Sequence, residues 1–155
     1  MSDFKIIGPV TFDQAIDETS TTQKAPLGMI VLAEDQADTG YGVGEFIYLK
    51  GVASTLVGSF VTIADNQTTA LAVANGIGQV AVAMSINVAS QFGWYQISGQ
   101  AAGKVLASFA SSGSDAFLTS TAGSLDDADV AGDFVLGAVP VSNIDTPSSG
   151  LAEFQ

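Results

Sequence analysis

The chain has 155 residues and a formal net charge of -12, from 16 acidic residues and four lysines, and it contains no Arg, His or Cys. Without Cys and His it can form no Ser-His-Asp triad, thiol nucleophile, disulfide or zinc site of the usual nitrogen and sulfur ligands. Four scattered lysines do not supply the clustered cations that nucleic acids or anionic membranes attract. The composition therefore favours a structural or binding role over an enzyme, with no nucleic acid or membrane partner.

The first 26 residues differ from the rest of the chain and are predicted to form an extended N-terminal arm. A polar segment rich in Ser and Thr ends at Ala25-Pro26, and capping-box spacing allows one helical turn over residues 12–17. Two interpretations stay open: a first strand docks on the chain's own core, or the arm packs on a neighbouring subunit. We predict that deleting residues 1–25 leaves the β core folded but weakens partner binding, whereas loss of folding would show that the arm is part of the core. An apolar stripe precedes the polar segment and consists of Phe4, Ile6, Ile7, Val10 and Phe12.

From residue 27 onward, short apolar runs alternate with turns rich in Gly, Asn and Asp. Asp65-Asn66 is a turn pair, and Asn75-Gly76 is the strongest short hairpin signal of the chain. The Ala-rich residues 100–112 give thin evidence for a turn or two of helix. The pattern predicts an all-β fold, a small β-barrel or sandwich of short antiparallel strands. The predicted strands are 29–32, 46–49, 60–63, 70–73, 80–84, 94–97, 104–106, 116–118 and 134–139.

These patterns divide the chain into an N-terminal arm (1–26), a β core domain (27–142) and a C-terminal tail (143–155) with one last strand at 151–154.

Residues 66–103 carry no charge over 38 positions, which is long enough to cross a bilayer. Asn, Gln and Gly interrupt this stretch, and its apolar residues are mainly Ala and Val, so we expect no membrane span. A chain this poor in charge indicates that a partner covers part of its surface.

Residues 126–133 form the densest charge cluster, with Asp126, Asp127, Asp129 and Asp133. Carboxylates suit Ca²⁺, but an EF-hand loop that begins at Asp127 would place Ala138 where its glutamate belongs. We interpret the cluster as a solvated acidic loop, with an irregular calcium site as the alternative. Other carboxylates could serve in glycoside hydrolysis by residue type alone. The sequence assigns no catalytic residue, no metal ligand and no cofactor.

Trp94 and Tyr95 are adjacent, so their side chains point to opposite faces of a strand. Either both anchor the core, or one of them contacts a neighbouring subunit, where Trp and Tyr are favoured. Together with the N-terminal stripe they give the candidate partner-binding residues, which are Phe4, Ile6, Ile7, Val10, Phe12, Trp94 and Tyr95.

The segment from Leu27 to Val141 resembles the small, His- and Cys-poor β proteins that decorate the heads of tailed phages, called capsid decoration or cement proteins. The resemblance rests on the order of elements, namely Pro26-Leu27-Gly28-Met29-Ile30-Val31, the strand from Gly58 to Ile63, Gly78-Gln79-Val80-Ala81-Val82-Ala83, Gly93-Trp94-Tyr95-Gln96-Ile97-Ser98-Gly99-Gln100-Ala101 and Ala131-Gly132-Asp133.

The resemblance implies a protein without enzymatic activity that binds the outer surface of a phage capsid, where capsomers meet, and stabilises their contacts. It also implies the major capsid protein as partner, self-association, often as a homotrimer, and an N-terminal arm that contacts the shell. The alternatives are another structural assembly protein, such as a phage tail or fibre component or a surface-layer protein, and a small carboxylate-based hydrolase.

Overall fold

The computed structural model describes residues 3–37, 40–107, 109, 115–141 and 150–155, and within these ranges it contains strands and turns but no helix. The predicted all-β class is therefore confirmed. The strands are β1 (Phe4–Ile7), β2 (Thr19–Ser20), β3 (Ile30–Asp35), β4 (Val43–Lys50), β5 (Phe60–Ile63), β6 (Thr69–Leu71), β7 (Gln79–Ala83), β8 (Phe92–Ser98), β9 (Ala101–Lys104), β10 (Phe117–Leu118), β11 (Leu125–Asp126) and β12 (Leu151–Phe154).

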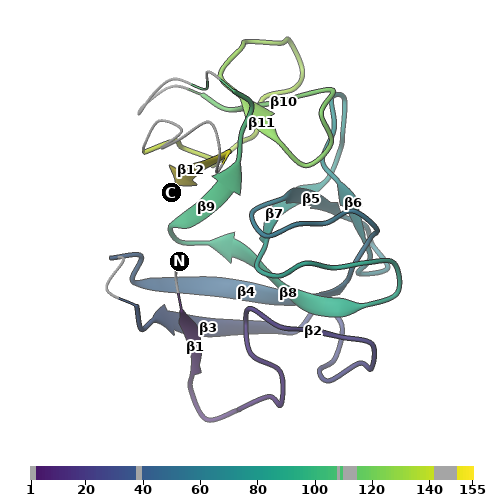
Figure 1. Ribbon diagram of the computed structural model, residues 1–155, viewed down its shortest axis with the longest axis vertical. Helices are drawn as coiled ribbons and strands as arrows, with labels where there is room; N and C mark the ends of the chain where they lie inside the picture. Colours follow the sequence, from purple (N-terminus) through teal and green to yellow (C-terminus); the bar gives the residue numbers. More distant parts are fainter. Residues whose placement is uncertain (1–2, 38–39, 108, 110–114, 142–149) are drawn as a thin grey trace.

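Most of the strands form one antiparallel sheet in the order β1-β3-β4-β8-β7-β5-β6, with β2 also paired to β8 (Figure 1). Two small sheets, β9–β12 and β10–β11, complete the fold. The large sheet curls, because Lys50 at the end of β4 bridges Thr68 beside β6 and its N–H donates to the Gln67 carbonyl at 3.1 Å. This contact is one bridge rather than a ladder, so the sheet of described strands is not closed into a barrel.

The curled part of the sheet encloses an apolar cluster, which we call the middle cluster. On β4, Ile47 and Leu49 point into this cluster, whereas Phe46 and Tyr48 point to the opposite face. All four side chains are buried, because the chain covers both faces of β4. The middle cluster consists of Ile47, Leu49, Val61, Ala81, Ala83 and Tyr95.

The N-terminal residues cover the other face of β4 and β8 and form a second layer, at the bottom of Figure 1. β1 pairs with β3, β2 pairs with β8, and Ala25 is buried just before β3. The first of the two interpretations of residues 1–26, a strand docked on the chain's own core, is the arrangement in the structure. The buried residues of this N-terminal cluster are Phe4, Ile16, Ala25, Ala33, Phe46, Tyr48 and Trp94.

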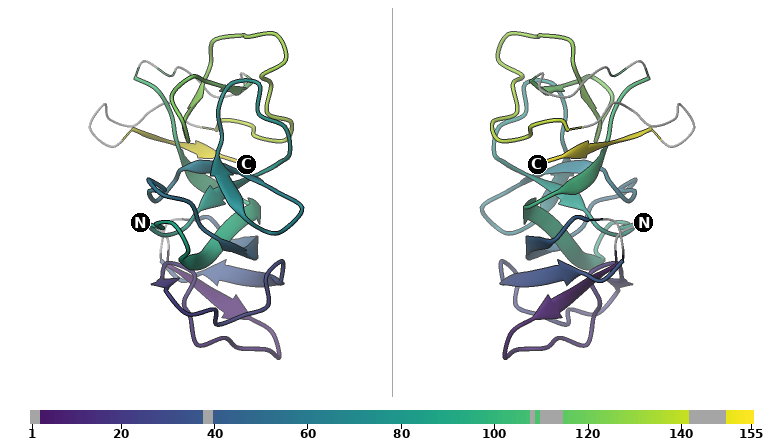
Figure 2. Two further views of the ribbon diagram at one scale, coloured as in Figure 1. Left: turned by 90° about the vertical axis from the view of Figure 1, so that its right-hand side faces the viewer. Right: turned by 90° about the vertical axis from the view of Figure 1, so that its left-hand side faces the viewer.

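The C-terminal residues form a third layer over β5 and β7, so the large sheet lies between two covering layers (Figure 2). Phe60 and Val82 of the sheet pack against this layer, and the Phe60 ring meets Phe154 edge-on at 5.2 Å between centroids. The packing is close, since a β-carbon at Gly103 of β9 would collide with the Phe60 ring.

Several strand predictions are confirmed. β5 coincides with the predicted 60–63, and β3, β4, β6, β7, β8 and β10 overlap their predicted ranges by two or more residues. The last strand is also confirmed, because β12 spans 151–154 and pairs with β9. Within residues 100–112, the described β9 is a strand rather than helix, while 108 and 110–114 lie outside the described residues.

Three local predictions are wrong. Asn75-Gly76 forms a turn, with Asn75 at φ 61°, but β6 and β7 each pair with β5 and not with one another. Residues 134–139 form no strand, because a turn at Leu136 and Gly137, the latter at φ 86°, interrupts the apolar run. Residues 12–17 form bends and a turn instead of a helical turn.

Candidate interaction surface

The structure separates the seven residues predicted to bind a partner. Phe4 and Trp94 are buried in the N-terminal cluster, where the half-buried Ile6 and Phe12 pack against them, and Tyr95 is buried in the middle cluster. Of the seven, Ile7 and Val10 are exposed. Trp94 and Tyr95 do point to opposite faces of β8, and both anchor the interior, so neither side chain is available at the surface.

Trp94 is held by rings and by a hydrogen bond. Its ring centroid lies 4.9 Å from that of Tyr48 and 5.6 Å from that of Phe12. Its Nε1–H donates to the carbonyl oxygen of Gln14 at 3.2 Å. The indole is therefore satisfied within the chain, as a buried Trp requires.

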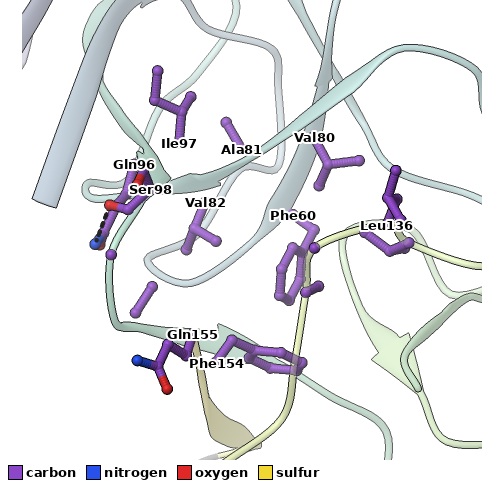
Figure 3. Close-up of a pocket in the computed structure, with 15 residues that line it drawn as sticks. Phe60, Val80, Ala81, Val82, Gln96, Ile97, Ser98, Leu136, Phe154 and Gln155 are labelled. Atoms are coloured by element: carbon purple, nitrogen blue, oxygen red, sulfur yellow. Dashed lines mark hydrogen bonds between the residues drawn. The ribbon is translucent and has the colours of Figure 1, made fainter.

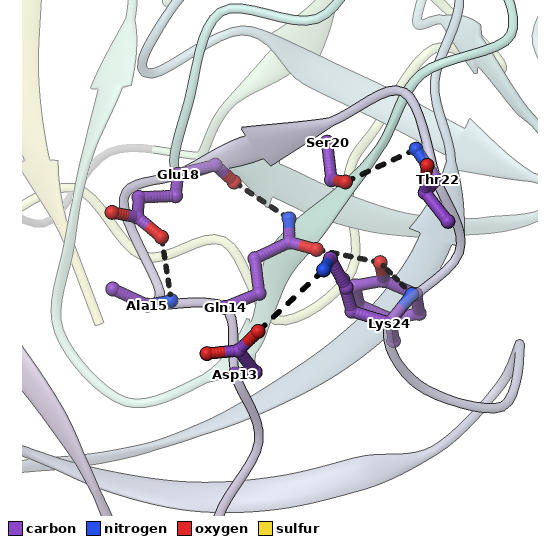
Figure 4. Close-up of polar contacts among 8 residues, drawn as sticks. Asp13, Gln14, Ala15, Glu18, Ser20, Thr22 and Lys24 are labelled. Carbon is purple, nitrogen blue, oxygen red and sulfur yellow. Dashed lines mark hydrogen bonds and ion pairs between the residues drawn. The ribbon is translucent and has the colours of Figure 1, made fainter.

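Gln14 joins the N-terminal layer to the sheet, although the sequence marked it only as part of the capping-box spacing and not as a buried residue. Its side chain is buried, and its Oε1 accepts a hydrogen bond of 2.6 Å from the Tyr48 hydroxyl. Its Nε2 donates to the carbonyl of Glu18 (Figure 4) and to that of Phe92, each at 2.9 Å. This one amide therefore fixes residues 13–18 on β4 and β8.

Tyr95 lies in an apolar environment, unlike Trp94 and Gln14. Its side chain is fully buried in the middle cluster, and its hydroxyl forms no hydrogen bond of standard geometry with the described residues. Burial raises the pKa of this phenol to about 12, and the nearby Thr69 hydroxyl only partly offsets the effect. Tyr95 thus has a structural role in the core of the curled sheet.

An exposed apolar surface lies on β1, β3 and β4, on the side of the sheet away from the N-terminal cluster. Ile7 and Leu32 are direct cross-strand partners. Ile30 and Val43 point to the same side of the sheet, in the adjacent cross-strand pairs Ile30–Ile47 and Glu34–Val43. These four side chains are between 40% and 53% exposed. We call them the β1–β3–β4 face.

The sequence of β3 explains this face. Val31 and Ala33 point to the N-terminal cluster, so Ile30 and Leu32 must point the other way, because side chains alternate along a strand. A run that is apolar on both faces is typical of a strand covered on both sides. Here the described chain covers one side, and the apolar residues of the other side remain exposed.

Charged side chains lie among the apolar residues of the β1–β3–β4 face. Glu34 lies opposite Lys5, and Glu45 lies opposite Leu32. Lys5 binds Asp3 at 2.8 Å, and this hydrogen bond raises the pKa of the Lys5 ammonium group. The face therefore mixes apolar and charged side chains, with Glu34 and Glu45 next to Val43 and Leu32.

A second exposed apolar group comes from two loops. Thr55 and Asn87 form an antiparallel bridge with both side chains buried, and the neighbouring side chains point outward. These outward residues are Leu56, Ile86 and Val88. Leu56 is 45% exposed, the same fraction as Leu32, which makes it a matched reference for that residue.

The acidic residues 126–133 do not converge. Asp133 is buried, and its carboxylate accepts a hydrogen bond from the backbone N–H of Asn75. This bond links the loop that contains Asp133 to the turn at Asn75. Asp129 is exposed, and burial beside Asp127 raises the pKa of Asp126. Among the residues that the structure describes, no three His, Cys, Asp or Glu side chains are grouped to hold a metal ion.

In the described ranges, no helix has the length and apolarity needed to cross a membrane. Comparison of the chain with protein-family models, with curated proteins and with solved structures found no match.

Proposed function

We propose that the protein is a structural virion protein that binds the outer surface of a phage capsid and stabilises the contacts between capsomers. The β1–β3–β4 face carries this proposal, since it presents four exposed apolar side chains on one side of a folded sheet. The resemblance of residues 27–141 to capsid decoration proteins supports the same function and names the major capsid protein as partner.

The energetics of such a surface suit a repeated, non-covalent attachment. Covering the exposed half of an Ile or Leu side chain contributes about 1 kcal/mol, so four of them give a weak contact at one site. A capsid repeats its sites many times, and linked copies convert weak contacts into firm attachment. A protein that binds the assembled shell but not the separate capsomers stabilises the shell by mass action. The net charge of -12 keeps the free protein soluble.

Binding to empty capsids that lack this protein tests the proposal. The wild-type chain should sediment with these capsids and raise their melting temperature. Leu32→Ser should weaken binding at least about fivefold, because it removes about 1 kcal/mol of apolar contact at each site. Leu56→Ser is the matched control, since it removes the same side chain at the same exposure from a different surface.

Two outcomes contradict the proposal. If the wild-type chain does not bind capsids, the function is excluded, and if Leu32→Ser and Leu56→Ser bind equally well, the β1–β3–β4 face is excluded. Electron microscopy of labelled virions separates the proposal from its alternative, because a tail or fibre component would lie away from the head.

A further inference from the structure

The Asn75-Gly76 pair lies in the turn between β6 and β7 and is chemically reactive. The sequence has four asparagines, and Asn75 is the one followed by glycine. In such a pair the glycine nitrogen attacks the carbonyl carbon of the asparagine side chain. A succinimide ring forms, and the side-chain nitrogen leaves as ammonia with the proton of the glycine N–H. Water then opens the ring at either carbonyl and gives aspartate or isoaspartate. Glycine favours the attack because its backbone rotates freely and no side chain shields its nitrogen.

The conformation of the turn requires this pair. Asn75 has φ 61°, in the left-handed region that asparagine tolerates better than most residues do. A β-carbon at position 76 would lie 2.8 Å from the Val73 carbonyl oxygen, so any residue other than glycine would strain the turn. The fold therefore depends on two residues that together form the most reactive asparagine site of the chain.

Water reaches the turn, and the backbone has room to move there. The Asn75 side chain is exposed. Gly76 lines a cavity of about 410 Å³, and the adjoining cavity of about 250 Å³ shares Val80 and Leu136 with it (Figure 3). Either volume is far above the roughly 10–15 Å³ that one water molecule needs. Neither the attack nor the hydrolysis of the ring is therefore blocked by packing.

Backbone hydrogen bonds restrain the turn in the folded protein. The Gly76 N–H donates to the Val73 carbonyl at 2.9 Å, and the Asn75 N–H donates to the carboxylate of Asp133. The attack needs the Gly76 nitrogen without its proton, and it needs Asn75 rotated out of its present conformation. Both hydrogen bonds oppose these changes, so the reaction requires a local opening of the turn.

Asp133 is itself held firmly. Its carboxylate belongs to a residue that is 2% exposed in the C-terminal layer. Its backbone carbonyl accepts from the Leu118 N–H at 2.7 Å, and its N–H donates to the Val130 carbonyl at 3.0 Å. The acceptor of the Asn75 N–H is thus fixed in place, which makes its bond an effective restraint on the turn.

We propose that Asn75 is a modification site of this protein, where spontaneous deamidation yields aspartate or isoaspartate, and that the hydrogen bond from its N–H to Asp133 sets the rate. Each product places a carboxylate at position 75 close to that of Asp133, and like charges so close are unfavourable. Isoaspartate also lengthens the main chain by a methylene group between the two N–H donors of the turn. Deamidation therefore weakens the attachment of the turn to the C-terminal layer, independently of the proposed function.

Incubation of the purified full-length chain at mildly alkaline pH, followed by peptide mass spectrometry, tests the site. We expect deamidation at Asn75, at least about tenfold slower in the folded chain than in urea above the unfolding transition, because the turn must first open. Asn66 and Asn87 are internal controls that should stay intact, since Asn66 is exposed but precedes Gln67 and Asn87 is fully buried. Faster reaction at either control, or equal rates in folded and unfolded chains, would overturn the inference.

Substitutions at Asp133 test the restraint. Asp133→Ala should raise the folded-state rate at Asn75 at least about threefold, because it removes the acceptor, and Asp133→Asn, which keeps an acceptor oxygen, should restore a slow rate. Asp129→Ala is the matched control, since Asp129 is an exposed aspartate nearby and should leave the rate unchanged. Thermal unfolding shows whether each variant is folded. A folded Asp133→Ala variant that deamidates at the wild-type rate would overturn the role of Asp133.

Two measurements need no substitution. Amide hydrogen exchange of Asn75 in the wild-type chain should be slowed by the bond to Asp133, and exchange at the rate of a free amide would contradict that bond. Anion exchange separates the deamidated chain by its added negative charge. This form should melt at a lower temperature than the fresh protein, and an unchanged melting temperature would show that the modification does not loosen the C-terminal layer.

Discussion

The Tyr48 hydroxyl donates to Gln14 Oε1 at 2.6 Å, and this bond links a residue of the N-terminal segment to a strand at the centre of the sheet. The same glutamine donates to the carbonyls of Glu18 and Phe92, so three hydrogen bonds of its side chain are made inside the protein. The N-terminal segment is thereby fixed by a polar network as well as by apolar contacts.

Gln14→Ala should lower the free energy of unfolding by about 2–3 kcal/mol. The substitution leaves the Tyr48 hydroxyl proton without its acceptor and two carbonyls without their donor, and unpaired buried groups are costly. Urea unfolding measures the loss. Gln23→Ala is the matched control, because Gln23 is exposed and its removal should change stability by less than about 0.5 kcal/mol. Equal effects of the two substitutions would contradict the assigned role of Gln14.

Deletion of residues 1–25 should abolish cooperative folding. It removes Phe4 and Ile16 from the N-terminal cluster and exposes Phe46, Tyr48 and Trp94 to water. Trp94 is the single tryptophan of the chain, so its fluorescence reports the result directly. We expect red-shifted emission in the deletion variant at once, without denaturant. A variant that kept blue-shifted emission and a cooperative transition would make residues 1–25 an arm that the core does not need.

Tyr95 should make stability fall at alkaline pH. Its folded pKa is about 12, above the usual value near 10, so between these pH values the unfolded chain has lost a proton that the folded chain keeps. The unfolded state then binds fewer protons, and the free energy of unfolding decreases by about 1.4 kcal/mol per pH unit. The contribution is fully present below pH 10 and is lost as the pH rises toward 12.

Tyr95→Phe removes this titration and the unpaired hydroxyl together. We expect a free energy of unfolding at pH 7 within about 1 kcal/mol of the wild type, and a shallower decline above pH 10. Urea unfolding at pH 7, 10 and 11 measures both. Identical alkaline declines in the two proteins would show that Tyr95 titrates normally in the folded state.

The sequence was informative where apolar alternation is strong. The runs at 46–49, 60–63 and 94–97 lie in β4, β5 and β8, because β-branched and aromatic residues there have no competing turn signal. The run at 134–139 is equally apolar, yet Gly137 takes a positive φ and allows a turn that exposes Leu136. A local pattern cannot show whether such a run has a neighbouring strand to pair with.

The pairing of strands and the polar contacts depend on positions far apart in the chain. The turn at Asn75-Gly76 was visible, but β5 lies between the strands that the turn connects. Gln14 was invisible as a buried residue, since its partners Tyr48 and Phe92 follow it by 34 and 78 positions. Of the predicted partner residues, Ile7 lies on the β1–β3–β4 face. Its neighbours Ile30 and Leu32 belong to a run that was predicted only as a strand, and Val43 lies outside the predicted strands.

The contacts of the N-terminal layer also set an order for synthesis on the ribosome. Trp94 follows Gln14 by 80 positions, and β2 pairs with β8. Until β8 has left the ribosomal exit tunnel, Phe4, Ile16 and Tyr48 have no complete set of neighbours and stay exposed to solvent and chaperones. The first third of the chain is thus made early and completes its packing late, because the N-terminal cluster can close only after β8 has emerged.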